Sequence, residues 1–256
     1  MGRPASKSKL PVTWLIPEHD KHRGLMVYVH GGSFLVGASP LVIKLMKKIA
    51  RKAGLALVMP QQRLAPEHPC PAAIDDIGGF LDALAEQGFA AKNIVLAGEQ
   101  TGANLLLAAL QQPNRLQQFC PAAQIYYSPW LDLTLSSVGS FMNRLGISQA
   151  QSREFAGMVP LFYLGMNEQS MSTSDPLASP INGPLAGLPP TLIHACESDI
   201  QVDDAKKLAT EIKANSGKTT LHVWPRVRHM WQRYDMRYCQ KSVEISAEFL
   251  LAHLPE

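Results

Sequence analysis

Two side chains suited to acid–base chemistry follow apolar segments near the end of the sequence. Asp199 stands in "ESDIQVDD" and His229 in "PRVRHMWQ". An aspartate that accepts a hydrogen bond from a histidine orients the ring, and the histidine can then take a proton from a nucleophile. A lone aspartate or histidine in a loop is usually a solvated or hydrogen-bonded polar residue, so the pair gains meaning only beside a nucleophile position earlier in the chain.

Such a position lies in the segment Ile94–Leu110, "IVLAGEQTGANLLLAAL", which predicts a buried strand, a sharp turn and a helix. The pattern G-x-S-x-G exposes a nucleophilic serine at this kind of turn. Residues 98–102 read G-E-Q-T-G, so glutamine takes the place of serine. The amide of Gln100 has no proton that His229 can remove at neutral pH, and its oxygen is a poor nucleophile. Thr101 is one residue past the turn, so its side chain should point away from the histidine.

A third feature is the motif "HGGS" at residues 30–33, which also follows a strand-like segment. Glycines permit backbone N–H groups to approach the oxygen of a reacting carbonyl closely, where bulkier residues would hinder them. Two glycines also serve simply to turn the chain, so this motif is weak by itself. Together with Gln100, Asp199 and His229, it forms a series of four elements in a meaningful order.

The elements that must position these residues alternate along the chain. Apolar strands alternating with helices indicate a mostly parallel sheet covered on both faces. The strands are expected at 12–17, 24–30, 55–60, 93–98, 123–129, 191–196 and 220–225, and helices at 40–54, 71–88, 101–112, 202–217 and 239–254. The four chemical elements then stand at the carboxyl ends of strands.

Residues 136–174 interrupt the alternation. This region has a helical segment, "QAQSREFAGMVPLFYLG", but no strand. In an α/β sheet an insertion after the carboxyl end of a strand lies over the ligand crevice. We interpret it as a cap insertion at about 136–174 in a single domain that spans residues 1–256. The alternative is a surface excursion without a role.

Composition argues against several other classes of protein. The formal charge of +3, from 24 basic and 21 acidic residues, is too small to indicate binding to nucleic acid or to an anionic membrane. The basic run "KLMKKIARK" fits the solvated face of a helix. No apolar run approaches the roughly 20 residues that span a bilayer. We therefore expect a cytoplasmic protein with no membrane span.

The four cysteines lie far apart and form no C-x-x-C pair: Cys70, Cys120, Cys196 and Cys239. We expect free thiols in a reducing compartment and no metal site. None of the four lies at the predicted turn around Gln100, so none is a substitute nucleophile.

Longer matches identify a family. The runs "YVHGGSFLVG", "RLAPEHPCPAAIDD", "DPLASPI" and "GLPPTLI" are far more specific than a five-residue turn. With them, the sequence resembles the hormone-sensitive-lipase-like esterase/lipase family of the α/β-hydrolase fold, from Val12 onward. The resemblance implies a mostly parallel central sheet with helices on both faces, carboxylic-ester hydrolysis and no cofactor. Family members usually have an N-terminal segment that completes the cap; this chain begins almost at the first strand, so we expect a small, reduced cap.

The resemblance also assigns an oxyanion hole. His30, Gly31 and Gly32 match the motif of the family, and Ser33 stands where its third glycine usually lies. The resemblance implies that the backbone N–H groups of Gly31 and Gly32 are two of the donors and that of Thr101 is the third.

The triad positions follow in the same way. Asp199 matches the acid that orients the histidine, His229 matches the base, and Gln100 matches the nucleophilic serine but breaks the pattern. The sequence therefore leaves two hypotheses. The chain is an esterase that has lost its nucleophile, naturally or by an engineered Ser→Gln change, or it is a non-catalytic protein that uses the retained pocket. In both cases the partner is a small acyl ester or carboxylate, and a homo-oligomer is possible.

Overall fold

The computed structural model describes residues 10–15, 23–136, 149–165, 171–225, 227, 229 and 236–255. It contains a seven-stranded sheet with the order β1-β3-β2-β4-β5-β6-β7, in which β1 pairs antiparallel with β3 and all the other pairs are parallel. The strands are β1 (Val12–Leu15), β2 (Gly24–Val29), β3 (Leu55–Pro60), β4 (Ile94–Glu99), β5 (Ala123–Tyr127), β6 (Thr191–Cys196) and β7 (Thr219–Trp224). The predicted mostly parallel sheet is confirmed.

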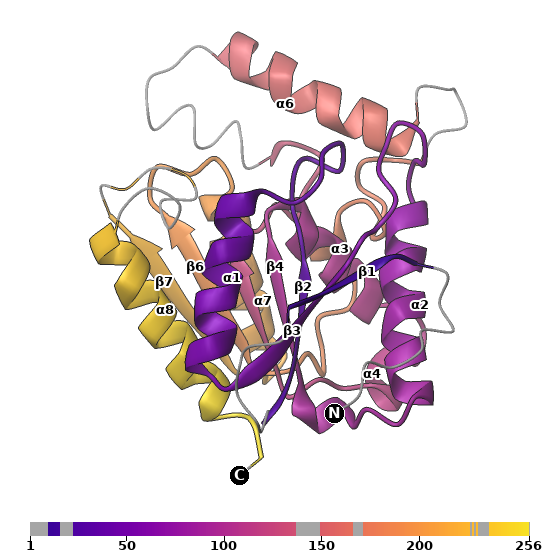
Figure 1. The fold of residues 1–256 in the computed structure, drawn as a ribbon. Coiled ribbons are helices and arrows are strands. Elements are labelled where there is room, and N and C mark those ends of the chain that lie inside the picture. Colours follow the sequence, from indigo (N-terminus) through magenta and orange to yellow (C-terminus); the bar gives the residue numbers. More distant parts are fainter. Residues whose placement is uncertain are drawn as a thin grey trace.

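Helices cover both faces of this sheet (Figure 1). The main helices are α1 (Pro40–Lys52), α2 (Ala72–Glu86), α3 (Thr101–Leu110), α6 (Gln149–Leu164), α7 (Val202–Ala214) and α8 (Met236–Leu251), with a short α4 (Arg115–Gln118) after α3 and 3₁₀ turns at Ala91–Asn93 and Pro180–Asn182. Buried residues of α1 and α8 form one hydrophobic cluster with the sheet, and those of α2, α3 and α7 form another. The apolar strand runs follow from this, because a strand covered on both faces buries every side chain.

Strand β2 shows the alternation directly. Met26 and Tyr28 belong to the cluster on the α1 and α8 side, while Leu25, Val27 and Val29 belong to the opposite cluster. All six residues of the strand are buried. Side chains of successive strand residues point to opposite faces, so one short run contributes to both halves of the core.

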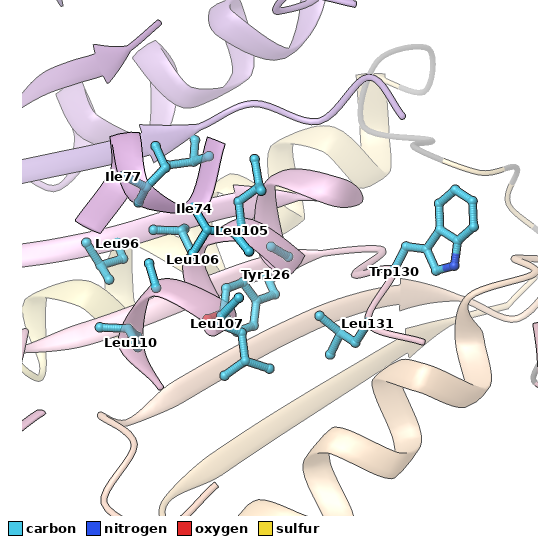
Figure 2. Packing of buried hydrophobic residues seen from close by; sticks show 14 of the residues in the cluster. Ile74, Ile77, Leu96, Leu105, Leu106, Leu107, Leu110, Tyr126, Trp130 and Leu131 are labelled. Atoms are coloured by element: carbon cyan, nitrogen blue, oxygen red, sulfur yellow. The ribbon is translucent and has the colours of Figure 1, made fainter. Parts of the chain in front are cut away.

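Helix α3 is the most completely buried helix among the described residues, with all ten of its positions buried. Figure 2 shows Leu105, Leu106, Leu107 and Leu110 of this helix packed with residues of the sheet and of α2. A helix that is apolar all round must lie within a core. This burial fixes the N-terminus of α3, and with it the turn that carries Gln100.

Figure 1 draws α6 beyond the carboxyl ends of the parallel strands, the place expected for a cap. Its C-terminal half joins the main core through Val159, Tyr163 and Leu164. Residues 137–148 and 166–170 of the predicted insertion at 136–174 lie outside the described residues, as does the end of the predicted first strand beyond Leu15. The expected helical segment is present as α6.

Candidate active site

Gln100 lies between β4 and α3 in a backbone conformation that L-residues rarely adopt, with φ 46° and ψ −115°. Two backbone hydrogen bonds hold it there. Its N–H donates to the Tyr127 carbonyl at 3.0 Å, and its carbonyl accepts from the Trp130 N–H at 3.1 Å. Residues kept in such conformations by their surroundings concentrate at functional sites. The predicted strand-to-helix turn at residue 100 is confirmed.

The two glycines of the turn permit the close approach of backbone segments. A Cβ on Gly102 would lie 2.2 Å from the Val29 carbonyl oxygen, and one on Gly98 would lie 2.8 Å from Ala103 backbone atoms. Any side chain at either position would push α3 away from the sheet. The packing of α3 against the sheet therefore requires glycine at positions 98 and 102, whichever residue lies between them at position 100.

Three polar side chains meet at this turn in a line of hydrogen bonds. The Gln100 Nε2 atom lies 2.5 Å from His229 Nε2, and His229 Nδ1 lies 2.7 Å from Asp199 Oδ2. A neutral imidazole with its proton on Nδ1 satisfies both contacts, donating to the carboxylate and accepting from the amide. The structure thus brings together three residues that are 30 or more positions apart in the sequence.

Asp199 and His229 differ in exposure. The Asp199 side chain is 1% exposed, whereas that of His229 is 36% exposed. The second oxygen of Asp199 accepts the Gln201 backbone N–H at 3.1 Å, so both carboxylate oxygens have donors. A buried carboxylate with fixed donors can hold the imidazole orientation, while the partly exposed ring remains accessible from solvent.

Ser198 links the loops that carry these two residues. Its hydroxyl donates to the Val227 carbonyl oxygen at 2.5 Å, two residues before His229. Sequence analysis did not single out Ser198. Its position next to Asp199 was the available signal, but a hydrogen bond to another loop depends on tertiary structure.

The HGGS turn lies beside Gln100. A Cβ built on Gly31 would lie 3.3 Å from Gln100 Oε1, and Gly32 has a φ of +112°, which favours glycine. The buried His30 ring donates from Nδ1 to the Gly31 carbonyl at 2.7 Å, and burial lowers the pKa of His30, so this ring stays neutral. Ser33, in place of a third glycine, has a φ of 55°. The motif is thus a compact turn whose shape depends on its glycines.

Gln62 also supports this turn, and sequence analysis missed it. Its amide donates from Nε2 to the His30 carbonyl oxygen at 3.0 Å, and the side chain is buried. The residue belongs to the segment after β3, 32 positions away in the chain. A single polar residue in a loop carries no sequence signal for such a contact.

All four cysteines are free thiols. Burial raises the pKa of Cys70 to about 11 and that of Cys196 to about 12, so both stay protonated at neutral pH. A protonated, buried thiol is a poor nucleophile. Among the described residues, no group of three or more His, Cys, Asp or Glu side chains is placed to hold a metal ion.

Comparison with known proteins identifies the family. A profile described as the alpha/beta hydrolase fold matches residues 26–233. The chain belongs to the α/β-hydrolase fold family. An acetyl-hydrolase from Streptomyces hygroscopicus is 30% identical over 239 residues, which cover 93% of this chain and 78% of that protein. An esterase from Acinetobacter venetianus is 31% identical over 215 residues, 83% of this chain and 68% of that one.

A solved structure supports the narrower assignment. The crystal structure of an esterase from the bacterial hormone-sensitive lipase family has a TM-score of 0.85 and 28% identity, covering 97% of this chain and 82% of that chain. The predicted resemblance to hormone-sensitive-lipase-like esterases is supported by this α/β-hydrolase relative. In the described part of the chain, no helix is long and apolar enough to cross a membrane.

Proposed function

We propose that this chain is a carboxylic-ester hydrolase scaffold whose nucleophile position is occupied by Gln100, so that it is inactive or severely impaired as an esterase. In this proposal Asp199 and His229 are the acid and base of the triad. The whole sequence, residues 1–256, is one domain with a cap insertion at about 136–174. The ligand class is a small acyl ester or the related carboxylate.

The observation that carries the proposal is the contact of Gln100 Nε2 with His229 Nε2 at 2.5 Å. In a serine hydrolase this ring nitrogen accepts the proton of the nucleophile. Here the amide of residue 100 donates to the same lone pair. An amide cannot complete the reaction, because it does not give up its proton at neutral pH and offers no alkoxide. The base is therefore oriented but engaged in a hydrogen bond that leads to no chemistry.

The proposed oxyanion site supports the same interpretation of Gln100. The resemblance assigns oxyanion donors to the backbone N–H groups of Gly31, Gly32 and Thr101. The Gln100 side-chain oxygen lies next to Gly31, and glutamine is bulkier than serine. The amide therefore occupies space that the carbonyl of an ester would need, and we expect it to lower the affinity for acyl ligands as well as turnover.

A fluorophosphonate probe tests this proposal. The alkoxide of an activated serine attacks phosphorus and displaces fluoride, which leaves a covalent adduct that mass spectrometry detects. The Gln100→Ser variant should become labelled at residue 100, and the unmodified chain should not. The double variant Gln100→Ser/His229→Ala is the control and should label far more slowly. Absence of labelling in a folded Gln100→Ser variant would contradict the assignment of residue 100.

Ligand binding separates this proposal from the alternative of a non-catalytic binding protein. If Gln100 obstructs the site, the Gln100→Ala variant should bind a short carboxylate such as butyrate more tightly than the unmodified chain, measured by calorimetry. A binding protein that uses its own Gln100 would show the reverse order, with binding lost on truncation of the amide.

A further inference from the structure

The β2–α1 loop, residues 30–39, has an unusual backbone. Gly32, Ser33 and Phe34 have φ values of 112°, 55° and 63° in succession. Two of these residues are not glycine, and a positive φ is unfavourable for residues with a Cβ. A loop of this kind keeps its shape only where other parts of the protein hold it.

The backbone of Phe34 is held on two sides. Its N–H donates to Thr101 Oγ1 at 3.3 Å, at the first residue of α3. Its carbonyl accepts the Ala65 N–H at 3.0 Å, from the segment after β3. Both contacts involve the main domain, next to the turn that carries Gln100.

The side chain of Phe34 is held from the cap. Its ring stacks on that of Tyr163 in α6, with ring centroids 3.6 Å apart and planes 9° from parallel. Both side chains are buried. The Tyr163 carbonyl accepts the Cys70 N–H at 2.7 Å, which ties the same turn of α6 to the main domain. The stack is thus a direct contact between the cap helix and the loop that carries Gly31 and Gly32.

The Tyr163 hydroxyl contributes little to this arrangement. It is buried beside the Cys70 thiol, and no other hydrogen-bond partner is found in the part of the chain that the structure describes. A thiol is a weak hydrogen-bond partner, so the aromatic ring is the part of the residue that stabilises the contact. Loss of the ring in Tyr163→Leu should therefore disturb the contact, whereas loss of the hydroxyl alone in Tyr163→Phe should not.

We propose that Tyr163 is a positioning residue: its ring, presented by the cap helix, fixes Phe34 and thereby the backbone amides of Gly31 and Gly32. The placement of α6 then sets the geometry of the proposed oxyanion donors. The kinetic consequence rests on the proposed ester chemistry, whereas the effect on the loop does not.

Hydrogen–deuterium exchange on the unmodified chain and its variants tests the effect on the loop without catalysis. In Tyr163→Leu, the peptide that covers residues 30–36 should exchange at least about tenfold faster, because the loop opens locally. Tyr163→Phe keeps the ring and should match the unmodified chain, with a melting temperature that is not lower. Leu161→Ala is the matched control, since this residue of the same helix is 58% exposed.

Kinetics in the Gln100→Ser background test the functional consequence. Tyr163→Leu should lower kcat by about tenfold or more with a small change in KM, since displaced oxyanion donors stabilise the transition state less. Tyr163→Phe should retain kcat. If Gln100→Ser itself is inactive, the proposed function fails, while the exchange experiment still decides the role of Tyr163.

The variant Phe34→Leu removes the other ring of the stack. It provides a second test in case Tyr163→Leu does not fold. If the stack is the link, the double variant Phe34→Leu/Tyr163→Leu should exchange at residues 30–36 no faster than the faster single variant. Unchanged exchange at residues 30–36 in Tyr163→Leu would overturn the proposal. So would a uniform rise in exchange over the whole chain, or an equal loss of kcat in Tyr163→Phe.

Discussion

At residue 100 the backbone geometry favours a nucleophile position, whereas the side chain has no nucleophilic group. The strained φ, the glycines on both sides and the bonds to Tyr127 and Trp130 fit the nucleophile position that we propose for this turn. The side chain that is presented is an amide, hydrogen-bonded to His229. The geometry of the turn is therefore set by its neighbours, and a substitution at residue 100 is expected to change chemistry more than fold.

The role proposed for Asp199 predicts a large kinetic effect. Asparagine in its place would donate to His229 Nδ1 and favour the tautomer that cannot accept a proton from residue 100. In the Gln100→Ser background, Asp199→Asn should therefore lower kcat by roughly 10³-fold to 10⁴-fold with little change in KM. Steady-state kinetics on an aryl ester measure this. A loss of less than about threefold would show that Asp199 does not orient the base.

Ser198 offers a milder comparison in the same assay. Its hydroxyl donates to the Val227 carbonyl and so connects the Asp199 loop to the segment that carries His229. Ser198→Ala should lower kcat by about tenfold, because the loop is less well fixed while the acid and base remain. An effect as large as that of Asp199→Asn would mean that the loop contact, and not the carboxylate, dominates.

At the scale of elements, the packing of α3 against β2 decides whether the turn forms. Gly102 allows the first turn of α3 to touch the backbone at the end of β2. Gly79 lies in α2 with nothing within 4 Å of the position that a Cβ would take. The two glycines therefore provide a matched pair, one required by contact and one not.

Replacement of each by alanine should shift stability in opposite directions. Gly102→Ala should destabilise the fold by about 3 kcal/mol, because the new methyl group collides with backbone atoms that cannot rotate away. Gly79→Ala should stabilise it by about 1 kcal/mol, because alanine favours the helix. Urea unfolding measures both. Equal effects of the two substitutions would refute the packing argument for Gly102.

The sequence predicted the elements well because their signals are local. The apolar run in β4 and the terminal glycine after α1 mark boundaries through residues that are adjacent in the chain. The order of Gln100, Asp199 and His229 located the candidate site, because parallel strands end at one edge of the sheet. The antiparallel pairing of β1 with β3 was not predicted, since a strand's direction depends on the path of the chain between elements.

The supporting contacts of the site could not be predicted. The stack of Phe34 on Tyr163 joins residues 129 positions apart, and the bond from Gln62 to His30 joins loops that follow different strands. Neither has a periodic pattern or a motif. Such contacts depend on how close two loops come, which the sheet order and the helix packing determine together.

At the scale of the whole molecule, a buried network of polar side chains connects strands β5, β6 and β7 to helix α8. His194 in β6 accepts a hydrogen bond from Trp224 Nε1 at Nδ1, at 3.1 Å, so its proton lies on Nε2, 3.1 Å from Ser246 Oγ in α8. The Tyr127 hydroxyl lies 2.7 Å from the same oxygen. Burial lowers the pKa of His194 to about 3, with a further contribution from His222. The folded protein therefore holds the His194 ring in its neutral form at neutral pH.

This network predicts acid sensitivity. The pKa of His194 is lower in the folded state than in the unfolded chain, where it is about 6.5. The unfolded state therefore binds the proton first as the pH falls below 6.5, and the free energy of unfolding decreases steadily from there toward pH 3. Between pH 7 and pH 5, His194 alone should account for a loss of about 2 kcal/mol.

Urea unfolding at a series of pH values checks this prediction. His30, whose pKa is also lowered by burial, adds to the loss in the same direction. The variant His194→Gln should be less stable at pH 7 but should lose less stability between pH 7 and pH 5 than the unmodified chain. An identical slope in the two proteins would show that His194 is not the group responsible.

The most direct test of the central claim is the hydrolysis of a short-chain aryl ester by the unmodified chain and by Gln100→Ser. We expect no activity above background for the chain with Gln100, since the group that contacts His229 is an amide, which cannot form an alkoxide. Gln100→Ser should raise kcat/KM by several orders of magnitude, and adding His229→Ala should remove the gain. Turnover at ordinary esterase rates by the unmodified chain, abolished by His229→Ala, would contradict the account.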